Sequence, residues 1–256
     1  MNINKHLILL FSVLFFLFAV SVSSGCFRKN ESDVKSVVRN ELDQLKNLDS
    51  ETTQKYIPYT ELFPDATENT DLTDEINETF SLFFRKFNYK ISDVIVGTAN
   101  HSATVSVKLT TIDSKVLARD FKAELLRTQI TESAQAQKGN IKDSSRSLEA
   151  HYLILNHLLN TNDYDTAETD CNIQLVNTGN NKKEKWKIQR TNSLEDDLVG
   201  GLIADLADPD ILSPEDTLTV YLDTLQKLDL KEMTSYLGVV CLLYTSDAAD
   251  DSLRVD

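Results

Sequence analysis

Residues 102–112 (SATVSVKLTTI) place the strongest limit on the fold, because apolar and polar side chains alternate along the run. Successive side chains of a strand point to opposite faces of a sheet, so this pattern predicts a strand with one buried and one solvated face. Strands of this kind are typical of antiparallel sheets. The buried face would carry Ala103, Val105, Val107 and Leu109.

Three further segments have strand character. Residues 89–98 come before this strand, and Ala99-Asn100-His101 forms a turn between the two, which predicts a β-hairpin. A second hairpin is predicted from residues 165–177 and 183–190, around the turn sequence Gly179-Asn180-Asn181. The apolar side of residues 165–177 would consist of Ala167, Thr169, Cys171, Ile173 and Leu175.

The other segments have helical periodicity. Helices are predicted at residues 33–47, 50–57, 71–86, 113–137 and 144–160. A connecting helix is predicted from Ser193, as N-cap with Asp196 three residues on, to Leu206, ending before Asp208-Pro209. Helices combined with antiparallel hairpins predict an α+β fold.

The N-terminus has the order of a secretory signal. Lys5 is followed by an apolar run over residues 7–22, by the small residues Ser23-Ser24-Gly25, and by Cys26. The alternatives are an ordinary signal peptide with a chance cysteine, or an uncleaved membrane anchor. The apolar run is short for a membrane span, which needs about 20 residues.

This segment resembles a bacterial lipobox, with Ser23 at the position where leucine is commonest. The resemblance implies cleavage between Gly25 and Cys26 and a diacylglycerol on the Cys26 thiol. More than one acyl chain is needed for stable anchoring, and a diacylated cysteine supplies this. We therefore expect residues 1–25 to be a signal peptide, residues 26–32 a short tether, and the protein to lie at the extracytoplasmic face of the cell membrane.

Residues 241–256 (CLLYTSDAADDSLRVD) do not continue any pattern that comes before them. Back-translation of Cys241 to Asp250 gives a sequence that resembles the transposase adapter of shotgun sequencing libraries. The alternative is a natural acidic tail. The adapter interpretation implies that the natural chain differs after Val240.

The charge balance limits the choice of partners. With 26 Lys and Arg against 40 Asp and Glu, the formal net charge is −14. Such a chain repels phosphate backbones, so nucleic acid is not expected as a partner, and Cys26 is the expected link to the membrane. Of the three cysteines, only Cys171 remains once Cys26 is lipidated and Cys241 is assigned to the adapter. We expect no disulfide and a core position for Cys171.

A repeat links the two ends of the chain. Ser213-Pro214-Glu215-Asp216 is a strong helix start, with a hydroxyl cap, a proline in the first turn and two acids. A shift of 180 residues superposes six residues of the segment that follows on identical ones. The pairs are Leu222 and Leu42, Asp223 and Asp43, Leu225 and Leu45, Leu228 and Leu48, Asp229 and Asp49, and Tyr236 and Tyr56. The repeat indicates two copies of one domain.

Helices followed by a hairpin, a helical excursion and a strand with Trp186-Lys187-Ile188 resemble the nuclear transport factor 2-like (cystatin-like) superfamily. The chain looks most similar to its lipid-anchored, often tandem members from Gram-positive bacteria. The resemblance implies a cone of helices on a bent antiparallel sheet over residues 33–192, with a helical insert at about 113–160. Residues 193–212 would connect it to the truncated start of a second copy at residues 213–240.

The resemblance gives Asp93, Tyr152 and Trp186 as candidate pocket residues. Asp170, His151 and His157 are further acid–base candidates, but the pattern favours solvated faces for the acids and helix-surface positions for the histidines. No phosphate loop, nucleophile motif or metal cluster occurs in the sequence, so neither a cofactor nor a metal is expected.

The sequence therefore favours a noncatalytic module that binds a small molecule or a protein. The alternatives are a small-molecule enzyme of the isomerase, dehydratase or hydrolase type, and a structural spacer.

Overall fold

The computed structural model of the protein describes residues 30–48, 50–57, 62–64, 66, 73–97, 101–136, 145–179 and 185–228. Several predictions lie outside these residues. They concern the signal peptide with Gly25 and Cys26, most of the tether, the central turn residues of both hairpins, the helix break near Gly139, and all residues after 228.

The chain forms two compact units, each assembled from three stretches of sequence. We call them the sheet unit and the helical unit. Among the described residues, the sheet unit draws on those of 30–56, 84–111 and 167–200, and the helical unit on those of 57–83, 112–166 and 201–228.

A four-stranded antiparallel sheet organises the sheet unit, in the order β1-β2-β3-β4. The strands are β1 (Asn88–Val96), β2 (Ser102–Ile112), β3 (Thr166–Asn177) and β4 (Trp186–Ile188). The first hairpin pairs Tyr89 with Leu109 and Val96 with Ala103, and its register shifts between Ile91 and Asp93. Both predicted hairpins and the α+β class are confirmed, although β4 is shorter than the predicted run.

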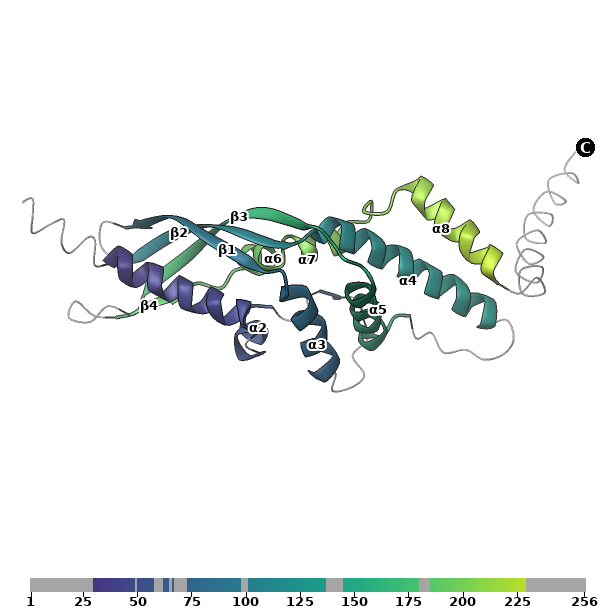
Figure 1. Cartoon of the computed structure of the whole chain (residues 1–256), viewed down its shortest axis with the longest axis horizontal. Helices are drawn as coiled ribbons and strands as arrows, with labels where there is room; N and C mark the ends of the chain where they lie inside the picture. Colours follow the sequence, from purple (N-terminus) through teal and green to yellow (C-terminus); the bar gives the residue numbers. More distant parts are fainter. Residues whose placement is uncertain are drawn as a thin grey trace, which may run out of the picture. The chain divides into compact units, whose positions relative to one another are not determined.

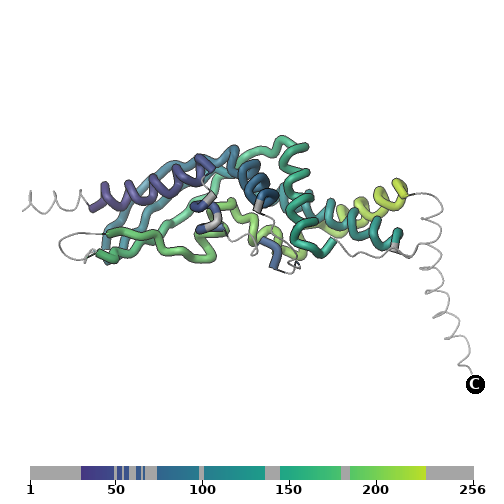
Figure 2. The backbone as a smooth tube through the Cα atoms, turned by 90° about the horizontal axis from the view of Figure 1, so that it is seen from below, coloured from purple at the N-terminus to yellow at the C-terminus, as the bar shows by residue number. Residues whose placement is uncertain are grey.

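One face of this sheet is apolar, as the alternation predicts. Val105 and Leu109 are fully buried, and Ile173 is 1% exposed. A helix over residues 30–46 lies along the sheet (Figures 1 and 2). Its buried stripe consists of Val34, Val38, Leu42 and Leu45. The core of the sheet unit therefore combines a helix stripe at 3.6-residue spacing with strand faces at two-residue spacing.

The other face of the sheet carries a polar ladder between β2 and β3. Thr104 donates to Gln174 over 2.9 Å, and Ser106 donates to Asn172 over 2.8 Å. Lys108 pairs with Glu168 at 3.1 Å and lies 3.8 Å from Asp170. Cross-strand pairs of this kind stabilise a solvated sheet face by a few tenths of a kcal/mol to about 1 kcal/mol each.

The prediction of one connecting helix is wrong about its N-cap and about its continuity. Its N-cap is Thr191, whose side chain accepts from the Leu194 amide, rather than Ser193. The helix is also broken in two, α6 (Asn192–Leu198) and α7 (Leu202–Ala207). Gly200 and Gly201 separate them with φ values of 67° and 92°, a left-handed backbone that glycine adopts without steric cost. The predicted end before Asp208-Pro209 is confirmed, with Asp208 as C-cap.

The helical unit is built around α4 (Ser114–Ala136), which contacts α5 (Leu148–Thr161), α7 and α8 (Pro214–Lys227). The Ser114 hydroxyl donates to the Asp205 carboxylate over 2.7 Å and ties α7 to the start of α4. α3 (Thr73–Phe84) contributes the buried side chains Ile76, Phe80 and Phe83. Short helix α2 (Ser50–Tyr56) belongs to the sheet unit.

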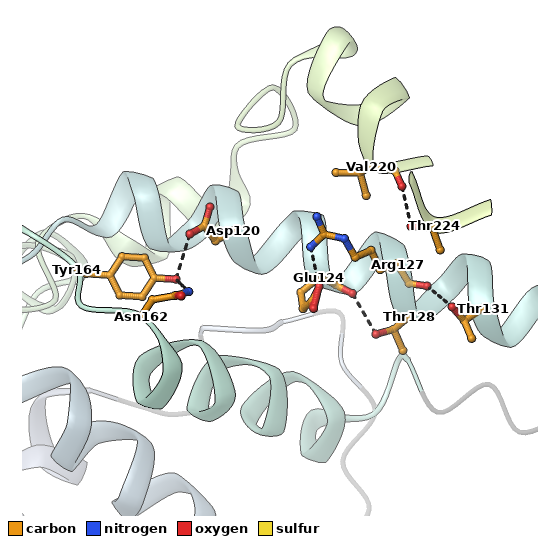
Figure 3. A network of polar contacts seen from close by, with 9 residues as sticks. All are labelled: Asp120, Glu124, Arg127, Thr128, Thr131, Asn162, Tyr164, Val220 and Thr224. Atoms are coloured by element: carbon orange, nitrogen blue, oxygen red, sulfur yellow. Dashed lines mark hydrogen bonds and ion pairs between the residues drawn. The ribbon is translucent and has the colours of Figure 1, made fainter. Parts of the chain in front are cut away.

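Polar contacts follow α4 along its length (Figure 3). Tyr164 donates to Asp120 over 3.1 Å, and Arg127 pairs with Glu124 at 2.7 Å. On α8, the side that carries Val220 and Thr224 is turned toward α4, and both residues are about one-twentieth exposed (Figure 3). α8 begins as predicted, with Ser213 capping the Asp216 amide.

Candidate ligand pocket

A pocket of about 490 Å³ lies within the helical unit. This volume falls in the range typical of small-molecule sites. Its walls come from α4, α5, α7 and the segments just before α3 and α5. The lining residues are Leu62, Phe63, Pro64, Ala66, Phe121, Lys122, Leu125, Gln129, Ser145, Arg146, His151, Ile203, Leu206 and Ala207.

An aromatic cluster forms the floor of the pocket. The Phe63 and Phe121 rings stack with centroids 5.1 Å apart, and the His151 ring lies 4.8 Å from Phe63 and 5.6 Å from Phe121. Tyr152 meets Phe63 edge-on from behind, at 5.4 Å. Packed rings hold one another in fixed orientations, so the floor is formed before any ligand arrives.

His151 is the titratable residue of the floor. Its Nε2 lies 3.0 Å from the Ser145 carbonyl oxygen, which only accepts, so Nε2 carries the proton in this arrangement. Nδ1 is buried and has no hydrogen-bond partner. Burial lowers the pKa of His151, and the nearby Lys122 ammonium lowers it further, whereas the bond to Ser145 raises it. The ring is therefore neutral near pH 7.

The prediction of a helix-surface position is wrong for His151. The residue sits at the first turn of α5, whose N-cap Ser147 accepts from the Ala150 amide at 3.1 Å. This cap fixes the direction of the helix and turns the imidazole toward Phe121 on α4. His157, six residues on, is exposed as predicted.

We expect the protein to lose stability as the pH falls below about 6.5, the ordinary histidine pKa. In this range the unfolded chain binds a proton at His151 that the folded ring resists, so the free energy of unfolding rises with pH. The slope stays below about 1.4 kcal/mol per pH unit, the limit for one proton, because the ring is partly exposed. Denaturant unfolding at several pH values measures it. His151→Gln should reduce the slope and the exposed-residue control His157→Gln should not; equal slopes in all three proteins would contradict the assignment.

The charged residues of the pocket are cationic. Lys122 and Arg146 line it together with the amide of Gln129, and none of the described lining residues is Asp or Glu. Arg146 and Gln129 are exposed, and Lys122 is half-buried, so these polar groups lie toward solvent. The buried lining residues Leu62, Phe63, Phe121 and Leu206 form the apolar interior, next to the buried backbone of Ser145.

The three candidate pocket residues from the sequence are divided between the two units. Asp93 is exposed on β1, opposite Ser106, and Trp186 is 6% exposed in β4 of the same unit. Tyr152 is fully buried in the helical unit behind Phe63. None of the three lines the pocket of the helical unit. Asp170 is solvated on the polar sheet face, as predicted.

A second, more open pocket of about 330 Å³ lies in the sheet unit between the helix over residues 30–46 and β1. Tyr89 donates to Asp43 over 2.6 Å, and Lys46 donates to Asn88 over 2.9 Å. Partial burial and the Asp43 carboxylate raise the pKa of Tyr89 to about 12. Because its polar groups bind one another and the site is open to water, it is a weaker candidate than the pocket of the helical unit.

Cys171 is a buried core residue in β3, as predicted. Burial raises the pKa of its thiol, and the nearby Asp197 carboxylate raises it further. A thiol of this kind is a poor nucleophile at neutral pH. Within the described ranges, no cluster of three metal-ligating side chains occurs, and no helix is long and apolar enough to cross a membrane.

No protein family, curated protein or solved structure matches this chain.

Proposed function

We propose that the protein is a lipid-anchored, extracytoplasmic binding protein whose helical unit holds a small ligand. The observation that carries this proposal is the 490 Å³ pocket, with its stacked aromatic floor and cationic groups toward solvent. A preformed apolar cavity with a few polar groups is the usual form of a small-molecule site.

A noncatalytic role is favoured over the enzyme alternative. A general acid–base mechanism requires convergent titratable groups at a reacting atom. His151 is the one acid–base candidate from the sequence that lies at the pocket, and none of the described lining residues is a carboxylate that could act with it. Asp93 and Asp170 belong to the sheet unit and are exposed.

The anchor rests on the sequence of residues 1–26. A basic start, an apolar run and small residues before Cys26 favour export and lipidation of the cysteine. The chain would then be tethered at the outer face of the membrane.

We expect Cys26→Ala to abolish incorporation of a labelled fatty acid and to release the protein from its lipid anchor. The change removes the only thiol of the lipobox-like segment, and with it the thioether to diacylglycerol. Metabolic labelling of cells that express either form measures this directly. Cys171→Ala is the matched control, because that thiol is buried and should leave labelling unchanged. Equal labelling of wild type and Cys26→Ala would refute the anchor.

We further propose that the domain is of the nuclear transport factor 2-like type. The α+β class, the helix along an antiparallel sheet and the two hairpins support this proposal. The helices predicted as an insert at about 113–160 are α4 and α5, which contribute Phe121, Lys122, Leu125, Gln129 and His151 to the pocket walls.

Support for a second domain copy comes from the burial of α8. Leu218 and Leu222 are 58% and 48% exposed, one turn apart on the same helix face. A shift of 180 residues matches them to Val38 and Leu42, which are 0% and 2% exposed in the helix on the sheet. α8 packs on α4 and buries Val220, Thr224 and Leu225, of which Leu225 matches the buried Leu45. The side of α8 with Leu218 and Leu222 stays exposed. We propose that this side packs on the sheet of a second copy in the natural chain.

A further inference from the structure

We propose that the ligand of the helical-unit pocket is an anionic amphiphile, a carboxylate on an apolar body. The body would lie on the aromatic floor of Phe63 and Phe121, and the carboxylate would lie between Lys122 and Arg146. This inference rests on the proposed binding function and names the ligand class of the same pocket.

The pocket interior is lined by buried apolar side chains. Phe121 is 1% exposed, Leu62 is 2% exposed and Leu206 is 5% exposed, although all three line the cavity. Side chains from three different segments thus enclose an apolar space. Removal of a hydrocarbon body from water into such a space is favourable in proportion to the apolar area it buries.

The charged residues of the pocket differ in sign from the chain as a whole. Acidic residues outnumber basic ones by 40 to 26 in the chain, yet the charged side chains among the described lining residues are Lys122 and Arg146. The Lys122 ammonium and the Arg146 guanidinium both attract a negative group in the pocket and both repel a positive one. The charged lining residues are therefore basic although the chain is acidic, and this favours an anionic ligand.

Three acids of the helical unit bind groups other than Lys122. Glu132 accepts from the Ser145 amide at 3.2 Å, Glu124 pairs with Arg127, and Asp205 accepts from Ser114. Lys122 has no carboxylate partner among the described residues, and its ammonium acts electrostatically on His151 in the floor. Its charge is thus available to a ligand that occupies the pocket.

The neutral histidine sets the polarity of the floor. Nε2 of His151 is bound to Ser145, so the ring adds no cation at depth near pH 7. An anionic headgroup gains more at the rim, next to Lys122 and Arg146, than among the aromatic rings, where it would lose its hydration. The tail-in, head-out orientation follows from this difference.

The test uses the mature chain from residue 26 with Cys26→Ser, which keeps it free of lipid, and isothermal titration calorimetry with three probes below their micellar concentrations. The probes share one tail and differ in the headgroup: dodecanoate, dodecan-1-ol and dodecyltrimethylammonium. We expect dodecanoate to bind about tenfold or more tightly than the cation, which is the effect of about 1.4 kcal/mol of charge preference.

Substitution separates the headgroup from the tail. Lys122→Gln should weaken dodecanoate binding by about tenfold and leave dodecanol binding unchanged. Lys115→Gln is the matched control, because Lys115 is exposed on the same helix and does not line the pocket. Ala66→Phe, which adds a ring within the pocket, should weaken all probes. Circular dichroism of each variant checks that it is folded.

The outcomes separate the two proposals. If dodecanol and the cation bind as tightly as dodecanoate, or if Lys122→Gln has no larger effect than Lys115→Gln, the anionic class is overturned while the binding function stands. If none of the probes binds to the folded wild-type chain, the amphiphile is overturned and the binding function loses its support from this pocket.

Discussion

Replacement of Leu42 by alanine is expected to lower the free energy of unfolding of the sheet unit by about 2–5 kcal/mol. Leu42 is 2% exposed on the helix that lies along the sheet, one turn from Val38 and Leu45. Truncation removes buried methyl groups and leaves a cavity that the neighbouring side chains fill only in part. The repeat provides a control, because Leu222 has the same residue type and is likewise followed by an aspartate and, three residues on, by a leucine.

Leu222→Ala should change the free energy of unfolding by about 0.5 kcal/mol or less, because the side chain is 48% exposed. Hydrogen exchange of the β2 and α8 amides measures both effects locally, which avoids the assumption that the two units unfold together. In a natural chain that contains a second copy, Leu222→Ala should instead cost as much as Leu42→Ala. If Leu222→Ala changes the free energy of unfolding of that longer chain by about 0.5 kcal/mol or less, the second copy is contradicted.

The strands were predictable because their local pattern and their burial agree. In β2 the apolar alternates Val105 and Leu109 are fully buried, and in β3 Cys171 and Ile173 are each 1% exposed. In a sheet with one buried face, a two-residue period allows a single strand register, since a shift of one residue would turn all the apolar side chains to solvent. The start of α8 was predictable for a similar reason, because Ser213 and Pro214 both favour a helix start.

The break between α6 and α7 was not predictable in the same way. Gly200 and Gly201 are compatible with a helix interior at a modest cost, and the residues around them keep a helical period. Only the tertiary structure decides that both adopt positive φ and interrupt the helix. Thr191 and Ser193 are both good N-caps, so the sequence alone could not choose between them.

The pocket was the part least visible in the sequence. Phe63, Phe121 and His151 come from three separate segments, and no local spacing relates them. One weak signal existed: Lys122 lies within the apolar spacing of Ala118, Phe121 and Leu125 on α4. A lone cation beside an apolar stripe more often extends into solvent along that stripe, so the signal had little weight by itself.

Arg190→Met is expected to lower the free energy of unfolding by about 3 kcal/mol, the second large effect. Glu195 lies in α6 with its side chain only 4% exposed, and the guanidinium of Arg190 is its ion-pair partner. Loss of the arginine leaves a buried carboxylate without its cation, and this penalty exceeds the worth of the pair itself. Arg190 is 45% exposed, which puts the expected cost at the low end of the range for buried pairs.

The double variant Arg190→Met/Glu195→Met separates the penalty of the unpaired Glu195 carboxylate from the contribution of the ion pair itself. With both charges gone, the buried site holds an apolar side chain of similar length, and most of the lost stability should return. Glu195→Gln keeps the shape of the side chain and removes its charge. Added to Arg190→Met, it should recover part of the stability that Arg190→Met loses. Two results together would contradict compensation of a buried charge: an unchanged free energy of unfolding for Arg190→Met, and a lower one for the double variant than for Arg190→Met. Arg190 would then contribute through packing of its apolar stem, which methionine replaces.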